Sequence, residues 1–164
     1  MSNEPASAPC YANEVDDAYM GYSPRDEILA ALNAFLETER AVMKSALATA
    51  RQASNSALAG LMRTVGTDAA HGCAILRRRI RWLGGTPSRR ACALQDRALA
   101  RADPHERLSV LIRGQTVLVR RLEALLPRLR QEGLSVELRV LADTHRGTIN
   151  AAEAVLKGNP PVRD

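Results

Sequence analysis

Apolar residues recur at spacings of three and four along most of this chain of 164 residues. Such spacing places them on one face of an α-helix, so it predicts amphipathic helices that each bury one apolar stripe. Four stretches are long enough to be separate helices. They cover residues 23–51, 57–83, 103–129 and 134–158.

The residues that flank these stretches are typical of helix starts and stops. Ser23 suits an N-cap, and Pro24 suits the first helical position. Asp103 and Pro104 repeat this pair before the third helix. Gly84, the first of two consecutive glycines, marks the end of the second helix.

The connections indicate how the helices pack. The first pair and the last pair are joined by short links, so each pair should form an antiparallel hairpin. Residues 86–103, with one short helix expected near 90–100, are long enough to cross the bundle from end to end. Two hairpins joined by one long crossover are the ferritin-like arrangement. We therefore predict an all-α, ferritin-like four-helix bundle over residues 23–158, with the crossover between helices two and three and a C-terminal tail over 159–164.

An irregular, acidic arm precedes the predicted bundle. Residues 1–22 lack clear periodicity and hold all three tyrosines, Tyr11, Tyr19 and Tyr22. Residues 1–39 contain eight acidic residues and one basic residue, whereas the whole chain has a net charge of +5, so the remainder is strongly basic. We expect the arm to dock on the basic surface of its own bundle or of a neighbouring one.

Composition narrows the fold class and the compartment. Hydrophobic residues make up 46% of the chain and aromatic residues 3%, which excludes a disordered or collagen-like chain and disfavours a β-sandwich or barrel. The sequence shows no signal peptide and no apolar run long enough to cross a membrane. Three cysteines, Cys10, Cys73 and Cys92, form no CxxC pair, which is typical of the reducing cytosol. We therefore expect a cytoplasmic protein.

Polar residues interrupt the apolar stripes near their middles. Glu39, Gln115 and His145 take these positions in the first, third and fourth helices, and the second helix places Ala69 and Cys73 there. A buried carboxylate is costly unless it is paired, and His145 or Gln115 can supply the partner. One interpretation is a hydrogen-bonded core layer that fixes helix register. Another is a single-metal or small-ligand site at Glu39 and His145, with Cys73 as a third member.

A di-metal oxidase is a third interpretation, and its ligand set is incomplete. Ferritin-like di-iron sites use a Glu from each of two helices and Glu-x-x-His from each of the other two. Here Ala142 lies three residues before His145, and Gln115 stands where a carboxylate is needed. Asp68 and His71 mimic the spacing, but helical geometry points His71 away from the stripe. Iron or another transition metal is the cofactor to test.

Several short motifs resemble one family. They are CYANE (10–14), DDAYMGY (16–22), ETERA (37–41), LGGTPS (83–88) and RGQ (113–115). In this order and spacing they are similar to a bacterial domain family of unknown function that is placed with the ferritin-like proteins. The resemblance spans about residues 10–156 and implies a ferritin-like bundle with no assigned activity. The family typically has Glu and Trp where this chain has Ala69 and Gly72, which implies a divergent member that has lost or changed the family's site.

These observations favour a non-catalytic binding or interaction domain with a structural polar layer. The alternative is a metal- or cofactor-dependent oxidoreductase that uses Glu39 and His145, with Cys73 and Gln115 beside them.

The densest basic run is a candidate surface for partners. It comprises Arg77, Arg78, Arg79 and Arg81. An acidic partner would suit it, and a solvated helix face partly paired with the acidic arm is the alternative interpretation. Nucleic acid is not expected, because no aromatic residue follows Trp82 to stack on bases and no nucleic-acid-binding motif appears. A homo-oligomer is the other assembly we consider.

Overall fold

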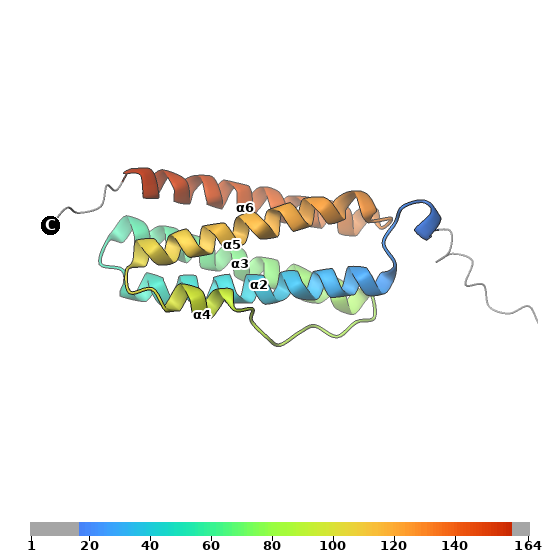
Figure 1. Ribbon diagram of the computed structural model, residues 1–164, viewed down its shortest axis with the longest axis horizontal. Helices are drawn as coiled ribbons and strands as arrows, with labels where there is room; N and C mark the ends of the chain where they lie inside the picture. The colour runs from blue at the N-terminus through green and yellow to red at the C-terminus, as the bar shows by residue number, and fades with distance from the viewer. Residues whose placement is uncertain (1–16, 159–164) are drawn as a thin grey trace, which may run out of the picture.

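Four long helices pack side by side in the computed structural model, which describes residues 17–158 (Figure 1). A short helix lies in the connection between the second and third of them. The bounds are α2 Arg25–Gln52, α3 Ser56–Trp82, α4 Leu94–Leu99, α5 Pro104–Leu125, the 3₁₀ turn η1 Leu126–Arg128, and α6 Glu132–Gly158. Within the described residues there is no strand, and no helix is long and apolar enough to cross a membrane.

The chain path forms two antiparallel hairpins. A short turn joins α2 to α3 at one end of the bundle, and another joins α5 to α6 at the opposite end (Figure 1). Between the hairpins, residues 83–103 run back along the length of the bundle and include α4. The predicted all-α four-helix bundle with one long crossover is therefore confirmed.

Side chains at the helix ends explain where α3 and α5 begin and where α3 stops. The Asn55 side chain accepts hydrogen bonds from two backbone N–H groups in the first turn of α3. The Asp103 side chain caps α5 by accepting a hydrogen bond from the Glu106 backbone N–H, and Pro104 follows it, as predicted. Gly84 adopts a φ of 74°, which other residues rarely take, so it ends α3.

Two predicted helix ends are wrong. The Ser23 side chain forms no cap, and its backbone N–H instead donates to the Arg128 carbonyl oxygen at 2.9 Å. The third helix was expected to continue to residue 129, but α5 ends at Leu125 and passes into η1. Pro127 lies within that turn and cannot donate a backbone hydrogen bond, so the α-helix does not extend through it.

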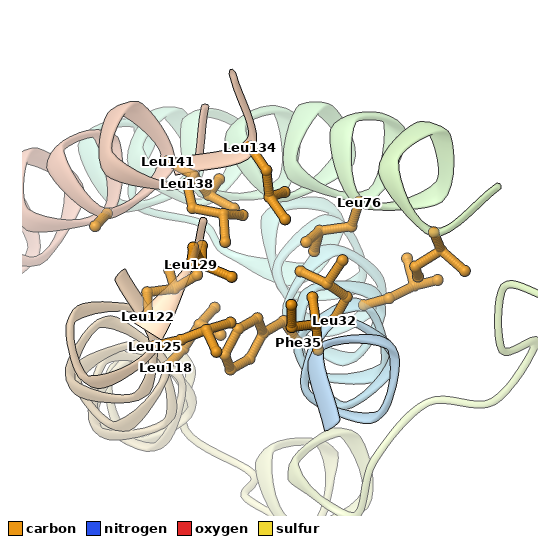
Figure 2. Close-up of a cluster of buried hydrophobic side chains, with 14 of the residues drawn as sticks. Leu32, Phe35, Leu76, Leu118, Leu122, Leu125, Leu129, Leu134, Leu138 and Leu141 are labelled. Carbon is orange, nitrogen blue, oxygen red and sulfur yellow. The ribbon is translucent and has the colours of Figure 1, made fainter. Parts of the chain in front are cut away.

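Two clusters of buried apolar side chains fill the bundle. Figure 2 shows one of them, where Phe35, the only phenylalanine in the chain, lies among leucines from α2, α3, α5 and α6. The other cluster contains residues such as Met62 and Leu108. Along α2 the first cluster ends at Leu36 and the second begins at Ala41. The two halves of the core therefore meet near the middle of the bundle, where a different kind of residue is buried.

Only the last residues of the acidic arm lie within the described part of the chain. Asp17 pairs with Arg130 at 2.7 Å, so the arm does meet a basic side chain there. Tyr19, in contrast, is 90% exposed. Tyr19 therefore does not pack on its own bundle, docking of the arm on a neighbouring chain stays a prediction, and Tyr11 lies outside the described residues.

Candidate functional site

Three fully buried polar side chains from three helices meet between the two apolar clusters. Glu39 comes from α2, Gln115 from α5 and His145 from α6, and each has zero exposure. His145 Nε2 lies 2.5 Å from Glu39 Oε1, and Gln115 Nε2 lies 3.3 Å from His145 Nδ1. The structure thus brings together three of the four polar residues singled out in the sequence.

The chemistry of the glutamine sets the direction of these hydrogen bonds. An amide nitrogen can only donate, so Gln115 donates to Nδ1 of the His145 ring. The ring proton then lies on Nε2, which donates to the Glu39 carboxylate. Both ring nitrogens of His145 are therefore occupied by protein groups. We call Glu39, His145 and Gln115 the polar layer.

Helix α3 contributes space rather than a ligand to this layer. Ala69 is fully buried, and Gly72 lies directly against the Glu39 carboxylate. A Cβ atom added at Gly72 would lie 2.6 Å from Glu39 Oε1, closer than real side chains approach. The absence of a side chain at this position therefore lets α3 pack beside the polar layer.

Cys73 lies beside the polar layer but has no hydrogen bond to it, so it does not complete the predicted set. Its side chain is 2% exposed and belongs to the same apolar cluster as Phe35. Burial raises the pKa of the Cys73 thiol to about 11, and the nearby charge of Glu39 adds to that rise. A thiol with such a pKa stays protonated near neutral pH, whereas nucleophilic or metal-ligating cysteines react as thiolates.

A second, partly buried contact adjoins the layer and was not predicted from the sequence. The Thr148 hydroxyl donates to Asp68 Oδ2 at 3.0 Å. Asp68 precedes Gly72 by four residues on α3, and Thr148 follows His145 by three on α6, so helical spacing places both on the side of the layer. This spacing is the signal in the sequence that points to the contact.

The environment of Glu39 shifts the pKa of its carboxyl group above the ordinary value. Burial raises this pKa, the hydrogen bond from His145 opposes the rise, and the charge of Asp68 adds to it. Two acceptor atoms of the layer, Glu39 Oε2 and Gln115 Oε1, are buried and have no hydrogen-bond partner among the described residues.

The donor set does not fit a di-metal centre. Where the two Glu-x-x-His motifs would lie, α3 has Ala69 and Gly72, and α6 has Ala142 and His145. Glu39 is the one carboxylate in the layer. Among the described residues, no group of three or more His, Cys, Asp or Glu side chains is placed to hold a metal ion. His71 is exposed on α3, as predicted.

The basic run divides between two environments. Arg78 and Arg79 both contact Glu137 of α6 at 2.7 Å, so part of the run is paired within the bundle, while pairing of the run with the acidic arm stays a prediction. Arg77 and Arg81 instead line a small pocket of about 380 Å³ at the start of the crossover, together with Arg40 and Arg89. Arg77 and Arg81 therefore face a concave surface.

Comparison with solved structures and sequences agrees with this architecture. The structure is similar to one described as "Crystal structure of ferritin like, diiron-carboxylate proteins from Bacillus anthracis str. Ames", with a TM-score of 0.73 and 19% sequence identity. The match covers 80% of this chain and 96% of that chain, and it confirms the ferritin-like fold. Residues 26–154 match the sequence model of a family described as "Domain of unknown function (DUF6306)". No curated protein matches the sequence.

Proposed function

The chain belongs to the DUF6306 family, and from this premise we propose that it is a non-catalytic binding or interaction domain built on a ferritin-like bundle. In this proposal the polar layer is structural. It occupies the part of the bundle where ferritin-like di-iron proteins carry their carboxylate ligands. His145 in this layer bonds to both Glu39 and Gln115 instead of presenting a ring nitrogen to metal.

One observation carries the proposal. His145 bonds Glu39 through Nε2 and Gln115 through Nδ1, so neither ring nitrogen is left to bind a metal. A histidine that ligates a metal uses one ring nitrogen for the ion and donates the other N–H to a neighbouring group. In this chain neighbouring side chains form hydrogen bonds with both ring nitrogens of His145.

The physical role of such a layer is specificity. Burying a charged or polar pair adds little net stability, because desolvation offsets most of the attraction between the partners. A wrong helix register, however, would leave Glu39 or His145 buried without a partner, which costs several kcal/mol. We propose that the layer sets the relative height of α2, α5 and α6 along the bundle.

Metal analysis of the full chain tests the proposal. The protein is incubated anaerobically with Fe(II) or Zn(II), desalted, and assayed for bound metal by mass spectrometry. We expect no stoichiometric metal in the native chain, nor in Glu39→Gln. Stoichiometric metal in the native chain that is lost in Glu39→Gln would overturn the proposal. Ala69→Glu serves as a second variant, because it adds a carboxylate where a di-metal site needs one.

The alternative is a metal- or cofactor-dependent oxidoreductase with a mononuclear site at Glu39 and His145. The observation in its favour is that Glu39 Oε2 and Gln115 Oε1 are buried without a partner among the described residues. Oxygen atoms of this kind can ligate a cation, and a buried water satisfies them equally well. The metal analysis above distinguishes a bound cation from a buried water. Only a cation appears in the metal assay, and a cation held by the Glu39 carboxylate is lost in Glu39→Gln.

Two further parts of the proposal concern setting and partners. We propose the cytosol as the compartment, in keeping with Cys73 and Cys92, which are free thiols. We also propose that an acidic partner would meet Arg77 and Arg81 rather than the whole basic run, because Glu137 already pairs with the other two arginines.

A further inference from the structure

A groove of about 870 Å³ lies between the crossover and α5, and none of the three polar-layer residues lines it. Its size is within the range of small-molecule sites. One wall is formed by α4 and the residues around it, and the other by α5. Leu94 fixes the two walls together, because its side chain sits against Gly114, where an added Cβ would lie only 2.5 Å from Leu94 Cδ2.

Residues from α5 form one continuous stripe along the groove. They are Val110, Arg113, Gly114, Val117 and Arg121. Their spacings of three and four place them on a single helix face, and Arg113 and Arg121 are separated by about 12 Å along the helix axis at 1.5 Å per residue. Val117 lies between them and is 49% exposed, so it presents apolar surface to the groove. The stripe therefore alternates charge with apolar surface.

The charge of the groove is entirely positive. Its lining includes four exposed arginines, two from the region of α4 and two from α5, and no acidic residue. They are Arg97, Arg101, Arg113 and Arg121. Among the described residues, none of these guanidinium groups forms an ion pair or side-chain hydrogen bond, in contrast to Arg78 and Arg79. Four unpaired guanidinium groups around one concavity repel each other, so an anion placed among them is stabilised.

We propose that this groove binds an organic anion in which a phosphate or carboxylate group is attached to an apolar body. Guanidinium groups present a planar fork of N–H donors that matches the oxygens of either group. The exposed valine and the two alanines that flank α4, Ala93 and Ala100, offer the apolar body a surface away from water. The inference rests on the proposed function, since it names the ligand class of the binding domain.

Titration calorimetry with four small probes tests the chemistry. Octyl phosphate and octanoate carry both features, inorganic phosphate carries only the charge, and 1-octanol only the apolar chain. We expect one octyl phosphate per chain, with a Kd at least about tenfold lower than for either single-feature probe. Octanoate, which carries the same two features, should also bind with a lower Kd than either single-feature probe. Binding of the intact chain to phosphatidylglycerol vesicles, without binding of monomeric octyl phosphate, would overturn the proposal in favour of a membrane headgroup surface.

Matched variants locate the binding. Arg113→Gln/Arg121→Gln removes two charges from the groove and should weaken octyl phosphate binding by about tenfold or more. Arg63→Gln/Arg139→Gln removes two exposed charges outside the groove and should leave the Kd unchanged. Equal weakening by both variants would show diffuse attraction to a basic surface and overturn the proposal.

Cys92 supplies a local reporter, because it lines the groove and is partly exposed while Cys73 is buried. In a Cys10→Ser chain, saturating octyl phosphate should slow alkylation of Cys92 by iodoacetamide. An unchanged alkylation rate at saturation would place the ligand elsewhere and contradict the inference. The metal analysis reports on the polar layer and these measurements on the groove, so either proposal can fail without the other.

Discussion

Gly72 of α3 lies against the Glu39 carboxylate of α2, and a methyl group at Gly72 would come within 2.6 Å of Glu39 Oε1 and 3.1 Å of Leu141 Cδ1. The close approach of these two helices at mid-height therefore depends on a missing side chain. Because interiors are tightly packed, the added atom has no free volume to enter. Glu39 would have to shift, and its 2.5 Å contact with His145 would shift with it.

Gly72→Ala should therefore destabilise the protein. Overpacking of this kind costs about 1–3 kcal/mol, which outweighs the gain of about 1 kcal/mol that alanine brings to a helix interior. Urea unfolding followed by circular dichroism measures the difference. Gly60→Ala is the matched control, since it lies on the same helix with nothing within 4 Å of the added Cβ, and it should stabilise the protein. Equal stabilisation by both variants would show that Gly72 is not tightly packed.

Glu39 and His145 should be strongly coupled in a double-mutant cycle. Each is fully buried, so Glu39→Ala or His145→Ala alone leaves a buried partner unpaired and should cost about 3–5 kcal/mol. The double variant removes both partners and should cost clearly less than the sum of the two single changes. Additive losses in urea unfolding would mean that the contact contributes nothing specific to the fold.

The raised pKa of Glu39 predicts a pH dependence of known sign. Above the ordinary carboxyl value of 4.5 the unfolded chain has released this proton, whereas the folded protein, whose Glu39 pKa is raised mainly by burial, still holds it. The contribution of Glu39 to stability is thus fully present below 4.5 and declines as pH rises through the folded pKa. The stability of the native chain minus that of Glu39→Gln should fall over this window. A difference that rises or stays flat would contradict the assignment.

Most of the fold could be predicted from the sequence because its signals are local. The apolar spacing predicted the four long helices, and the Asp103 cap predicted where one of them begins. The long link before Asp103 predicted the crossover. The errors at Ser23 and Leu129 have a different origin. The Ser23 backbone N–H donates to the carbonyl oxygen of Arg128, a residue far away in the sequence. Local helix propensity cannot predict such a tertiary contact.

The site was predictable in its members but not in its geometry. Periodicity placed Glu39, Gln115 and His145 at similar heights along the bundle. Which of these partners each ring nitrogen of His145 bonds depends on side-chain conformations, and periodicity does not encode them. The role of Gly72 was also hidden, because a glycine within a helix is ordinarily read as a weak point rather than as space for a neighbour. The groove arginines are spread over two elements and meet only in the folded chain.

Glu137 should stabilise the bundle through its two arginine partners. The hydrogen bond from Arg79 is the main cause of the lowered pKa of Glu137, so this carboxylate is ionised more readily in the folded state. Its contribution is present above the ordinary value of 4.5 and is lost as pH falls through the folded pKa. Glu137→Gln should cost about 1 kcal/mol at neutral pH and less in high salt. Arg77→Gln, which breaks no such pair, should change the unfolding free energy little; a loss as large as that of Glu137→Gln would contradict this.

Gly114 should hold α4 in place, and through it the shape of the groove. A Cβ atom at this position would lie 2.5 Å from Leu94 Cδ2, and Leu94 is itself only 4% exposed, so Gly114→Ala must push α4 outward. We expect a loss of about 1–3 kcal/mol in urea unfolding, together with faster alkylation of Cys92, which precedes α4 by two residues.

Two further variants separate packing from helix propensity. Gly147→Ala, with nothing within 4 Å of the added Cβ, should leave Cys92 alkylation unchanged. Leu94→Ala normally costs about 2–5 kcal/mol by opening a cavity, but in the Gly114→Ala background it should cost less, because it also relieves the clash. If Leu94→Ala costs the same in both backgrounds, the two side chains do not meet and the wall of the groove is held by other contacts.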